Sequence, residues 1–239
     1  FHLTELVKKG LSLYKSAMQS KIIIAGATGL VGSELLRLAL ADPEVDEVIS
    51  LVRRSSGIAN PKLTEEIIDF DYLESHHLIV QGDAVFCCLG TTIKKAGSKD
   101  NFRKVDFHYP LELAKIAKKN NVPQFNIVTA MGADAKSSIF YNKVKGEVEE
   151  AIIKLKIDST NIFRPSLLMG DRKESRKGEK IGIALAKIIN PLMVGPLRKY
   201  RGIKATDVAR AMLINSKTTK EGLHIFSSDQ IYDIAANDI

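Results

Sequence analysis

The chain has 239 residues, of which 45% are hydrophobic and 26% charged; this is typical of one soluble α/β domain that buries its core without disulfides or metals. No apolar run reaches the ~18 residues that a membrane helix needs, and the first residues lack the apolar core of a signal peptide. The net charge of +7 comes from lysines and arginines spread along the chain, so we expect a solvated surface and no specific nucleic-acid partner.

Residues 1–20 form the first predicted element, a helical appendage ahead of the first strand. Two interpretations are open: the helix packs on the domain or a neighbouring subunit, or its lysines and apolar side chains contact a membrane surface. The apolar stripe is short, so we favour packing, with weak or no membrane contact and a homodimer as one form of it. The stripe consists of Leu3, Leu6, Val7, Leu11, Leu13 and Tyr14.

The segment "KIIIAGATGLVG" over residues 21–32 combines an apolar strand with three glycines spaced three apart, and a helical pattern follows. In a strand-turn-helix unit, such glycines allow a tight turn, a close approach of the backbone to a diphosphate, and packing of the helix on the strand. The helix N-terminus then favours the negative charge of the diphosphate. A tight turn without any ligand is the alternative. The expected cofactor-binding residues here are Gly26, Thr28, Gly29, Leu30, Val31 and Gly32.

The second predicted strand ends at Arg53 and Arg54, where a site that prefers NAD usually has an acidic residue. Guanidinium groups hold a 2′-phosphate, whereas a carboxylate repels it. The sequence therefore favours NADP(H), with NAD(H) as the alternative if the arginines only cover the surface. Asp69, near the end of the third predicted strand, is a candidate to accept a hydrogen bond from the adenine amino group.

The fourth predicted strand ends in "CCLGTT", residues 87–92, at the same edge of the sheet. Gly90 allows the backbone to approach the cofactor, and threonine hydroxyls follow it. The cofactor-binding candidates in this segment are Leu89, Gly90, Thr91 and Thr92.

The two cysteines, Cys87 and Cys88, are neighbours on this strand and point to opposite faces, so they do not bridge easily. Their thiols indicate a reducing setting, and we expect a cytoplasmic protein. Neither cysteine has a histidine at metal-motif spacing, so we expect no metal site.

A helix predicted after the fifth strand carries Tyr141 and Lys145, four residues apart and therefore on one face. A tyrosine ordinarily ionises near pH 10, and a nearby ammonium stabilises the phenolate. The pair is suited to move a proton in an alcohol–carbonyl interconversion beside a nicotinamide.

Together, "GATGLVG", "CCLGTT" and "YNKVK" resemble the short-chain dehydrogenase/reductase superfamily. The segment "FRPSLLMGDRKESRKGE" adds the Arg-Pro segment of its atypical branch, and the chain resembles the Tat-interacting-protein oxidoreductase-like group of that branch. The resemblance implies an NADP(H)-binding Rossmann fold, the Tyr141/Lys145 pair, Pro165 beside the cofactor, and a polar residue on the strand before the pair.

That third catalytic residue is open in this sequence. The family tends to place serines after the fifth strand, whereas this chain has Thr129 followed by Ala130. A threonine hydroxyl also polarises a carbonyl. Ser137 and Ser138, a few residues before Tyr141, are the alternatives to Thr129.

Apolar runs alternate with amphipathic helices along the whole chain, a pattern that predicts βαβ units and a parallel sheet. We expect a Rossmann-type doubly wound α/β fold over residues 1–239, with helices on both faces of the sheet. Residues from about 165 to 239 are less regular, and we expect them to form a smaller substrate-side portion.

The favoured function is an NADP(H)-dependent oxidoreductase that acts on an unidentified small carbonyl or alcohol. One alternative is an epimerase or dehydratase for nucleotide sugars, for which the C-terminal part is short. The other is a non-enzymatic protein that binds NADPH, against which the intact Tyr141/Lys145 pair argues.

Overall fold

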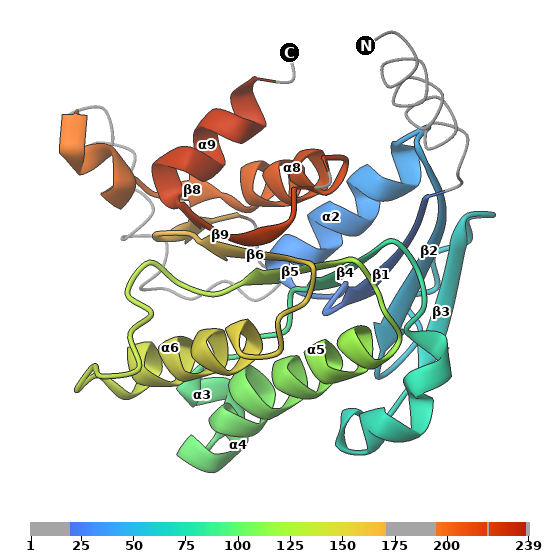
Figure 1. The fold of residues 1–239 in the computed structure, drawn as a ribbon, viewed down its shortest axis with the longest axis horizontal. Coiled ribbons are helices and arrows are strands. Elements are labelled where there is room, and N and C mark those ends of the chain that lie inside the picture. The colour runs from blue at the N-terminus through green and yellow to red at the C-terminus, as the bar shows by residue number, and fades with distance from the viewer. Residues whose placement is uncertain (1–19, 171–194, 219, 238–239) are drawn as a thin grey trace, which may run out of the picture.

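A parallel sheet forms the centre of the molecule. The computed structural model describes residues 20–170, 195–218 and 220–237, so nearly all of the helix predicted over residues 1–20 lies outside the described residues. Within these residues, seven strands form the main sheet in the order β3-β2-β1-β4-β5-β6-β9 (Figure 1). This order confirms the doubly wound Rossmann fold. The strands are β1 (Ser20–Ala25), β2 (Val45–Val52), β3 (Leu63–Ile67), β4 (Ala84–Cys87), β5 (Gln124–Val128), β6 (Ser159–Arg164) and β9 (Gly222–Ser227).

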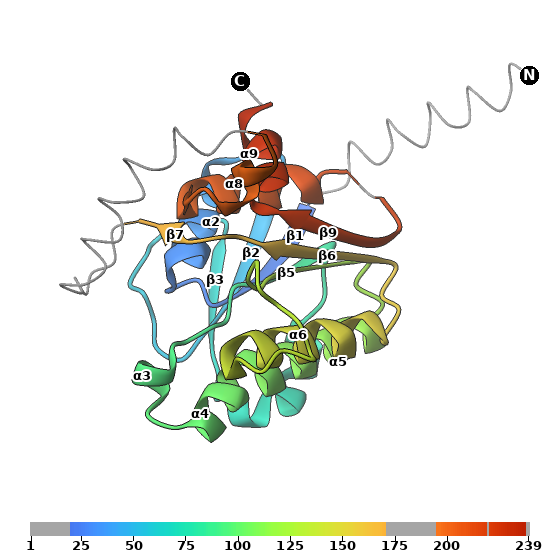
Figure 2. The same ribbon diagram turned by 90° about the vertical axis from the view of Figure 1, so that its left-hand side faces the viewer.

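Helices cover both faces of the sheet, as Figures 1 and 2 show. Among the described residues, three long helices lie on one face and two on the other, and the helices of each face pack on separate apolar clusters. The first group is α2 (Leu30–Ala41), α8 (Ala205–Ser216) and α9 (Ser228–Ala236), and the second is α5 (Tyr109–Lys119) and α6 (Phe140–Ile153).

The two clusters explain why the central strands are continuous apolar runs. Successive strand side chains point to opposite faces. Ile22 and Ile24 of β1 therefore belong to the cluster beneath α2, whereas Ile23 and Ala25 belong to the cluster beneath α5. A strand covered on both sides needs apolar residues at every position, which is the pattern of a parallel sheet.

The described residues of the last third of the chain form a small extension beside the main sheet and also complete the main fold. Two short strands, β7 (Leu168–Met169) and β8 (Ile203–Lys204), pair in parallel beside the main sheet. They flank a 3-10 helix, η4 (Gly195–Tyr200). The helices α8 and α9 and the edge strand β9 instead complete the main fold. The predicted substrate-side portion is thus partly a small extension and partly the end of the Rossmann unit.

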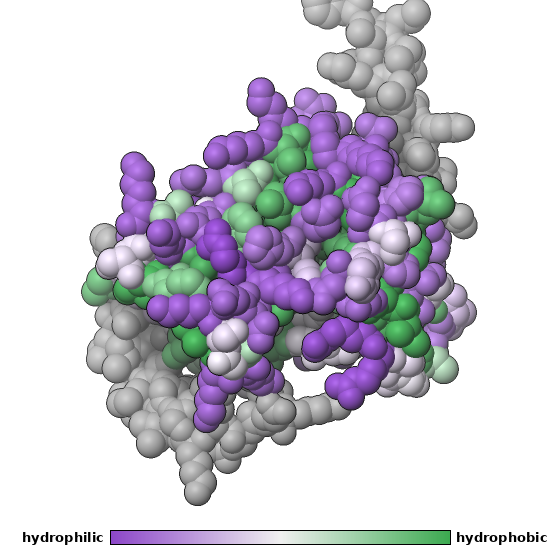
Figure 3. Space-filling model, turned by 90° about the horizontal axis from the view of Figure 1, so that it is seen from below, coloured by the Kyte–Doolittle hydropathy of each residue, from purple (hydrophilic) through white to green (hydrophobic). Residues whose placement is uncertain are grey.

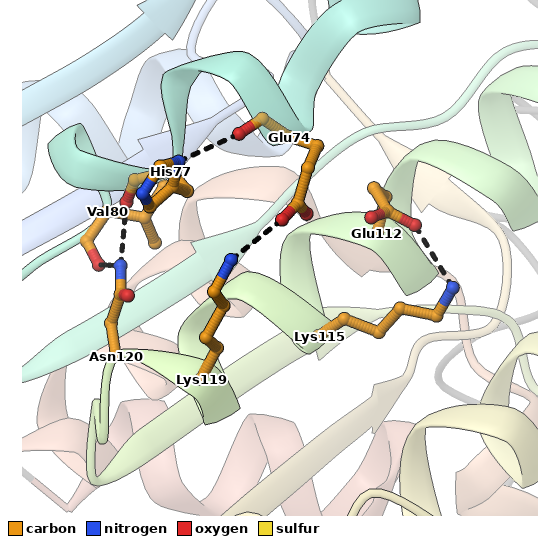
Figure 4. A network of polar contacts seen from close by, with 7 residues as sticks. All are labelled: Glu74, His77, Val80, Glu112, Lys115, Lys119 and Asn120. Carbon is orange, nitrogen blue, oxygen red and sulfur yellow. Dashed lines mark hydrogen bonds and ion pairs between the residues drawn. The ribbon is translucent and has the colours of Figure 1, made fainter.

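Short helical segments connect β3 to β4 and β4 to α5, on the lower side of the sheet in Figure 1. They are η1 (Phe70–Ile79), α3 (Ile93–Ala96), α4 (Lys99–Arg103) and the π-helical turn η2 (Lys104–His108). Figure 4 shows how η1 is held against the end of α5. The Asn120 side-chain amide donates to the carbonyls of His77 and Val80, and Lys119 pairs with Glu74 at 2.9 Å.

The lower face of the molecule is largely hydrophilic in Figure 3. The exposed positions of α5 and α6 include Lys115, Lys119, Lys143 and Glu150. The predicted homodimer stays a prediction. In the described part of the chain, no helix is long and apolar enough to cross a bilayer.

Candidate cofactor and catalytic site

The glycine turn between β1 and α2 has a steric explanation for two of its glycines. Gly26 adopts a left-handed φ of +90°, and a Cβ there would lie 2.6 Å from the Cys88 carbonyl. A Cβ on Gly32 would lie 2.1 Å from the Gly26 oxygen. The turn closes through a hydrogen bond from the Gly29 N–H to the Gly26 oxygen at 2.9 Å. Gly26 and Gly32 therefore shape the turn, and α2 begins directly after it.

A cleft of about 1130 Å³ opens beside this turn. It also reaches the residues that follow β4 and the first turns of α6, so segments far apart in the sequence face one space. Because Gly29 caps α2 without a side-chain hydrogen bond, the first N–H groups of the helix are available to an anion. Of the residues predicted from the sequence, the cleft is lined by Thr28, Gly29, Leu30, Val31, Leu89, Gly90, Thr91, Thr92, Thr129, Tyr141 and Lys145.

Lys145 is buried and paired with a carboxylate that the sequence did not single out. Its ammonium lies 2.7 Å from Asp106 Oδ1, and the side chains are 6% and 1% exposed. Burial lowers the pKa of Lys145, but the charge of Asp106, followed by that of Tyr141, outweighs it and leaves this pKa raised. The lysine is therefore a cation that faces the cleft.

Tyr141 is half-buried at the start of α6. Its ring packs against the buried Phe102 of α4, with the ring centroids 5.7 Å apart. The structure thus brings Tyr141 and Lys145 to one cleft on one helix face, with a packed ring and an ion-paired ammonium.

Thr129 lines the cleft directly after β5, but its hydroxyl already donates a hydrogen bond within the protein. Its Oγ1 donates to Glu149 Oε1 at 2.5 Å. Glu149, 2% exposed, also accepts from the Nε of Arg164 at 3.1 Å, and the two form an ion pair. This geometry argues against Thr129 as a donor to a substrate oxygen.

The alternative hydroxyls lie outside the cleft lining. Ser137 Oγ accepts from the Ile139 N–H at 3.2 Å ahead of α6, and Ser138 is exposed. The structure therefore brings neither serine to the Tyr141/Lys145 pair, and the third catalytic residue stays a prediction.

Six predicted cofactor-binding residues are absent from the residues that line the cleft: Gly26 and Gly32, which shape the turn, and Arg53, Arg54, Asp69 and Pro165. Arg53 and Arg54 are exposed directly after β2. The Asp69 carboxylate is turned to its own chain, where it accepts from the Asp71 N–H at 3.0 Å and begins η1. Pro165 is buried, and its carbonyl accepts from the Met131 N–H at 3.0 Å. Asp69 and Pro165 thus have local structural roles in this arrangement.

An acidic residue on β3 lines the cleft in their place. Glu65 accepts from the Ser55 hydroxyl at 2.5 Å and from the Ser56 N–H. These hydrogen bonds, that of Ser55 foremost, hold the pKa of Glu65 below its usual value. Its carboxylate therefore fixes the loop that follows Arg53 and Arg54. No sequence pattern marked Glu65, because the contact depends on how that loop folds back.

Both cysteines are free thiols, and burial raises their pKa values. Among the described residues, no three His, Cys, Asp or Glu side chains gather in a group that could hold a metal ion.

Comparisons with known proteins give a consistent result. A family model described as NAD(P)H-binding matches residues 26–177. Protein HTATIP2 of Rattus norvegicus is 41% identical over 203 residues, which are 83% of this chain and 82% of the relative. Protein FMP52, mitochondrial, of Candida albicans is 34% identical over 223 residues, which are 90% of this chain and 95% of the relative.

Solved structures share the fold at low identity. The Bordetella bronchiseptica enzyme WbmH in complex with NAD+ is 19% identical with a TM-score of 0.67, over 88% of this chain and 76% of that one. UDP-glucose 4-epimerase of Thermotoga maritima is 15% identical with a TM-score of 0.64, over 91% and 82%. These likenesses concern the fold alone.

The prediction of a cytoplasmic protein is wrong. The FMP52 relatives from Candida albicans and other fungi are named mitochondrial proteins. The prediction depended on unpaired thiols, which indicate a reducing compartment but do not identify which one.

Proposed function

Since this chain belongs to the NAD(P)H-binding family of rat HTATIP2 and the fungal FMP52 proteins, we propose that it is an NADP(H)-dependent oxidoreductase that interconverts a carbonyl and an alcohol. Membership confirms the family resemblance seen in the sequence. The observation that carries the proposal is that Tyr141 and Lys145 line the same cleft as the glycine turn at the start of α2.

The residues of the cleft fit a dinucleotide. The free N–H groups at the start of α2 suit the diphosphate, and Gly90 leaves room for the cofactor beside β4. The Lys145 ammonium is placed to donate to a ribose hydroxyl. When bound, the nicotinamide supplies or accepts a hydride.

Tyr141 has the proton-transfer role in this proposal. In reduction, its hydroxyl donates a proton to the substrate oxygen as that oxygen gains negative charge. The phenolate left behind is stabilised by the Lys145 ammonium, which burial keeps away from water. In oxidation the same groups act in reverse, with Tyr141 accepting the proton of the alcohol.

The preference for NADP(H) is supported by charge. Arg53 and Arg54 provide two exposed cations directly after β2. Glu65, the acidic residue near this end of the cleft, already accepts hydrogen bonds from Ser55 and Ser56. A 2′-phosphate therefore has guanidinium partners available on the segment that usually contacts it.

The direct test is an activity assay with NADPH and a panel of small aldehydes and ketones. Turnover is measured as the decrease in absorbance of the reduced nicotinamide. We expect at least one compound to be reduced by the wild-type chain and not by the Tyr141→Phe variant. Tight NADPH binding with no turnover across the panel and in the reverse direction would favour a non-enzymatic NADPH-binding protein.

A further inference from the structure

Asp106 occupies an unusual place in the backbone. It lies in η2, the π-helical turn inserted between α4 and α5. Such turns widen a helix locally and are frequent at functional sites. The Asp106 side chain is 1% exposed and lines the inner wall of the cleft. A carboxylate is rarely buried this deeply unless it is paired.

The carboxylate joins two parts of the proposed cofactor site. Its Oδ1 lies 2.7 Å from the Lys145 ammonium, and its Oδ2 accepts from the Thr91 N–H at 2.9 Å. Gly90 is close to both charged groups, since a Cβ there would lie 3.4 Å from Asp106 Oδ1 and 3.8 Å from Lys145 Nζ. One side chain therefore links the loop after β4 to the lysine of α6.

We propose that Asp106 is the positioning residue of this site, which holds the Lys145 ammonium charged and in place while it fixes the loop at Thr91. The proposal rests on the proposed function, because the ammonium matters here as a partner of the cofactor. Asp106 acts through Lys145 and needs no contact of its own with the cofactor or the substrate.

The surroundings of Lys145 show why this carboxylate is needed. The titratable groups that face the ammonium are Asp106 from η2, Tyr141 from its own helix and Cys87 from β4. Burial raises the pKa of Cys87 to about 12, so its thiol is neutral at physiological pH. Among these neighbours, Asp106 is the carboxylate, and it forms an ion pair with the ammonium at 2.7 Å. Without it, desolvation would dominate and the pKa of Lys145 would fall.

The matched variant is Asp106→Asn, which keeps the shape and an oxygen that accepts from the Thr91 N–H but removes the charge. We would titrate the variant and the wild type with NADPH between pH 6 and pH 9, using cofactor fluorescence. In the wild type, Lys145 stays protonated over this pH range. We therefore expect its contribution to NADPH affinity to change little with pH. The variant should lose affinity as the pH rises, because Lys145 becomes neutral, by about tenfold or more for one lost charge-assisted hydrogen bond.

Asp71→Asn is the control. Asp71 also pairs with a lysine, Lys104, at 2.6 Å, but this pair is largely exposed and does not line the cleft. We expect the Asp71→Asn variant to follow the wild-type pH curve. If Asp106→Asn followed it as well, the positioning role would be wrong. If the wild type bound no NADPH at any pH, the proposed function itself would fail.

A second comparison keeps the test decisive if Asp106→Asn does not fold. Lys145→Met leaves the buried Asp106 carboxylate without its cation, so adding Asp106→Asn should raise the melting temperature at neutral pH. In the wild-type background Asp106→Asn should lower the melting temperature, and failure of that single variant to fold is the extreme of the same loss. Equal shifts in both backgrounds would show that the two side chains are not coupled and would overturn the proposal.

Discussion

Proton transfer in the proposed reaction depends on one phenol whose ring is held firmly. Tyr141 packs against Phe102, and the buried Lys145 lies on the same helix face. A phenylalanine would keep the ring contact and remove the hydroxyl. The Tyr141→Phe variant therefore separates an effect on proton transfer from an effect on cofactor binding.

We predict that Tyr141→Phe reduces turnover by at least about a hundredfold, the usual scale of general acid–base catalysis, and changes NADPH affinity by no more than a few-fold. Steady-state rates and a fluorescence titration measure the two quantities. Tyr109→Phe is the control: its hydroxyl donates to Asp71 at 2.5 Å outside the cleft, so its loss should leave turnover unchanged. Near-normal turnover in the Tyr141 variant would remove the residue from the mechanism.

Thr129 gives a second test at this scale. Its hydroxyl donates to the buried Glu149, so we predict that Thr129→Val lowers stability by about 1.5 to 3 kcal/mol, as for a hydrogen bond to a charged group. Turnover at saturating substrate should fall only a few-fold. Denaturant unfolding and initial rates measure the two effects. A large loss of rate with unchanged stability would instead make Thr129 the donor to the substrate.

Among the elements of the fold, α2 depends on the absence of a side chain in its first turn. It starts from a turn in which a Cβ on Gly32 would lie 2.1 Å from the Gly26 oxygen. The nearest atoms are all backbone atoms of Gly26 and Ala27, which have little room to adjust, so the helix would have to move away from β1. Such a shift would also displace the N–H groups that face the cleft.

We predict that Gly32→Ala lowers the free energy of unfolding by about 1 to 3 kcal/mol, as for overpacking, and weakens NADPH binding. Gly90→Ala is the matched control for stability, because its new methyl group would meet nothing closer than 3.4 Å. Chemical denaturation compares the two variants. A Gly32→Ala protein as stable as the wild type would show that the turn adjusts freely.

The segment after β2 governs the choice of cofactor in our proposal. We predict that replacing Arg53 and Arg54 together by alanine weakens NADPH binding about ten- to hundredfold and changes NADH binding little, because one charge-assisted hydrogen bond contributes about 1.5 to 3 kcal/mol. Parallel titrations with both cofactors measure this. An equal loss for both cofactors would mean that the arginines act on the loop and not on the 2′-phosphate.

For the molecule as a whole, the sequence was sufficient to predict the fold. Apolar runs such as "IIIA" and "AVFC" predict strands buried on both faces, and these are β1 and β4. The glycine turn was also predictable, because its residues are adjacent in the sequence and their spacing has a steric cause. The position of Tyr141 and Lys145 on one helix followed from helical periodicity alone.

Contacts between distant segments could not be predicted in this way. Asp106 lies 39 positions before Lys145, inside a π-helical turn that looks like ordinary helix in the sequence. Glu149 directly precedes the exposed Glu150 on α6, yet it is buried against Thr129 and Arg164. Glu65 reaches the cleft only because the loop after β2 folds back on it. Each role comes from tertiary packing and leaves no local pattern.

The most direct test of the central claim is a titration of the wild-type chain with NADPH and with NADH. The cleft, the free start of α2 and the buried Lys145 predict saturable binding of NADPH. The arginines after β2 predict that NADH binds about ten- to hundredfold more weakly. Equal affinity for the two would contradict the NADP(H) preference, and the absence of saturable binding for both would contradict the account of the cleft.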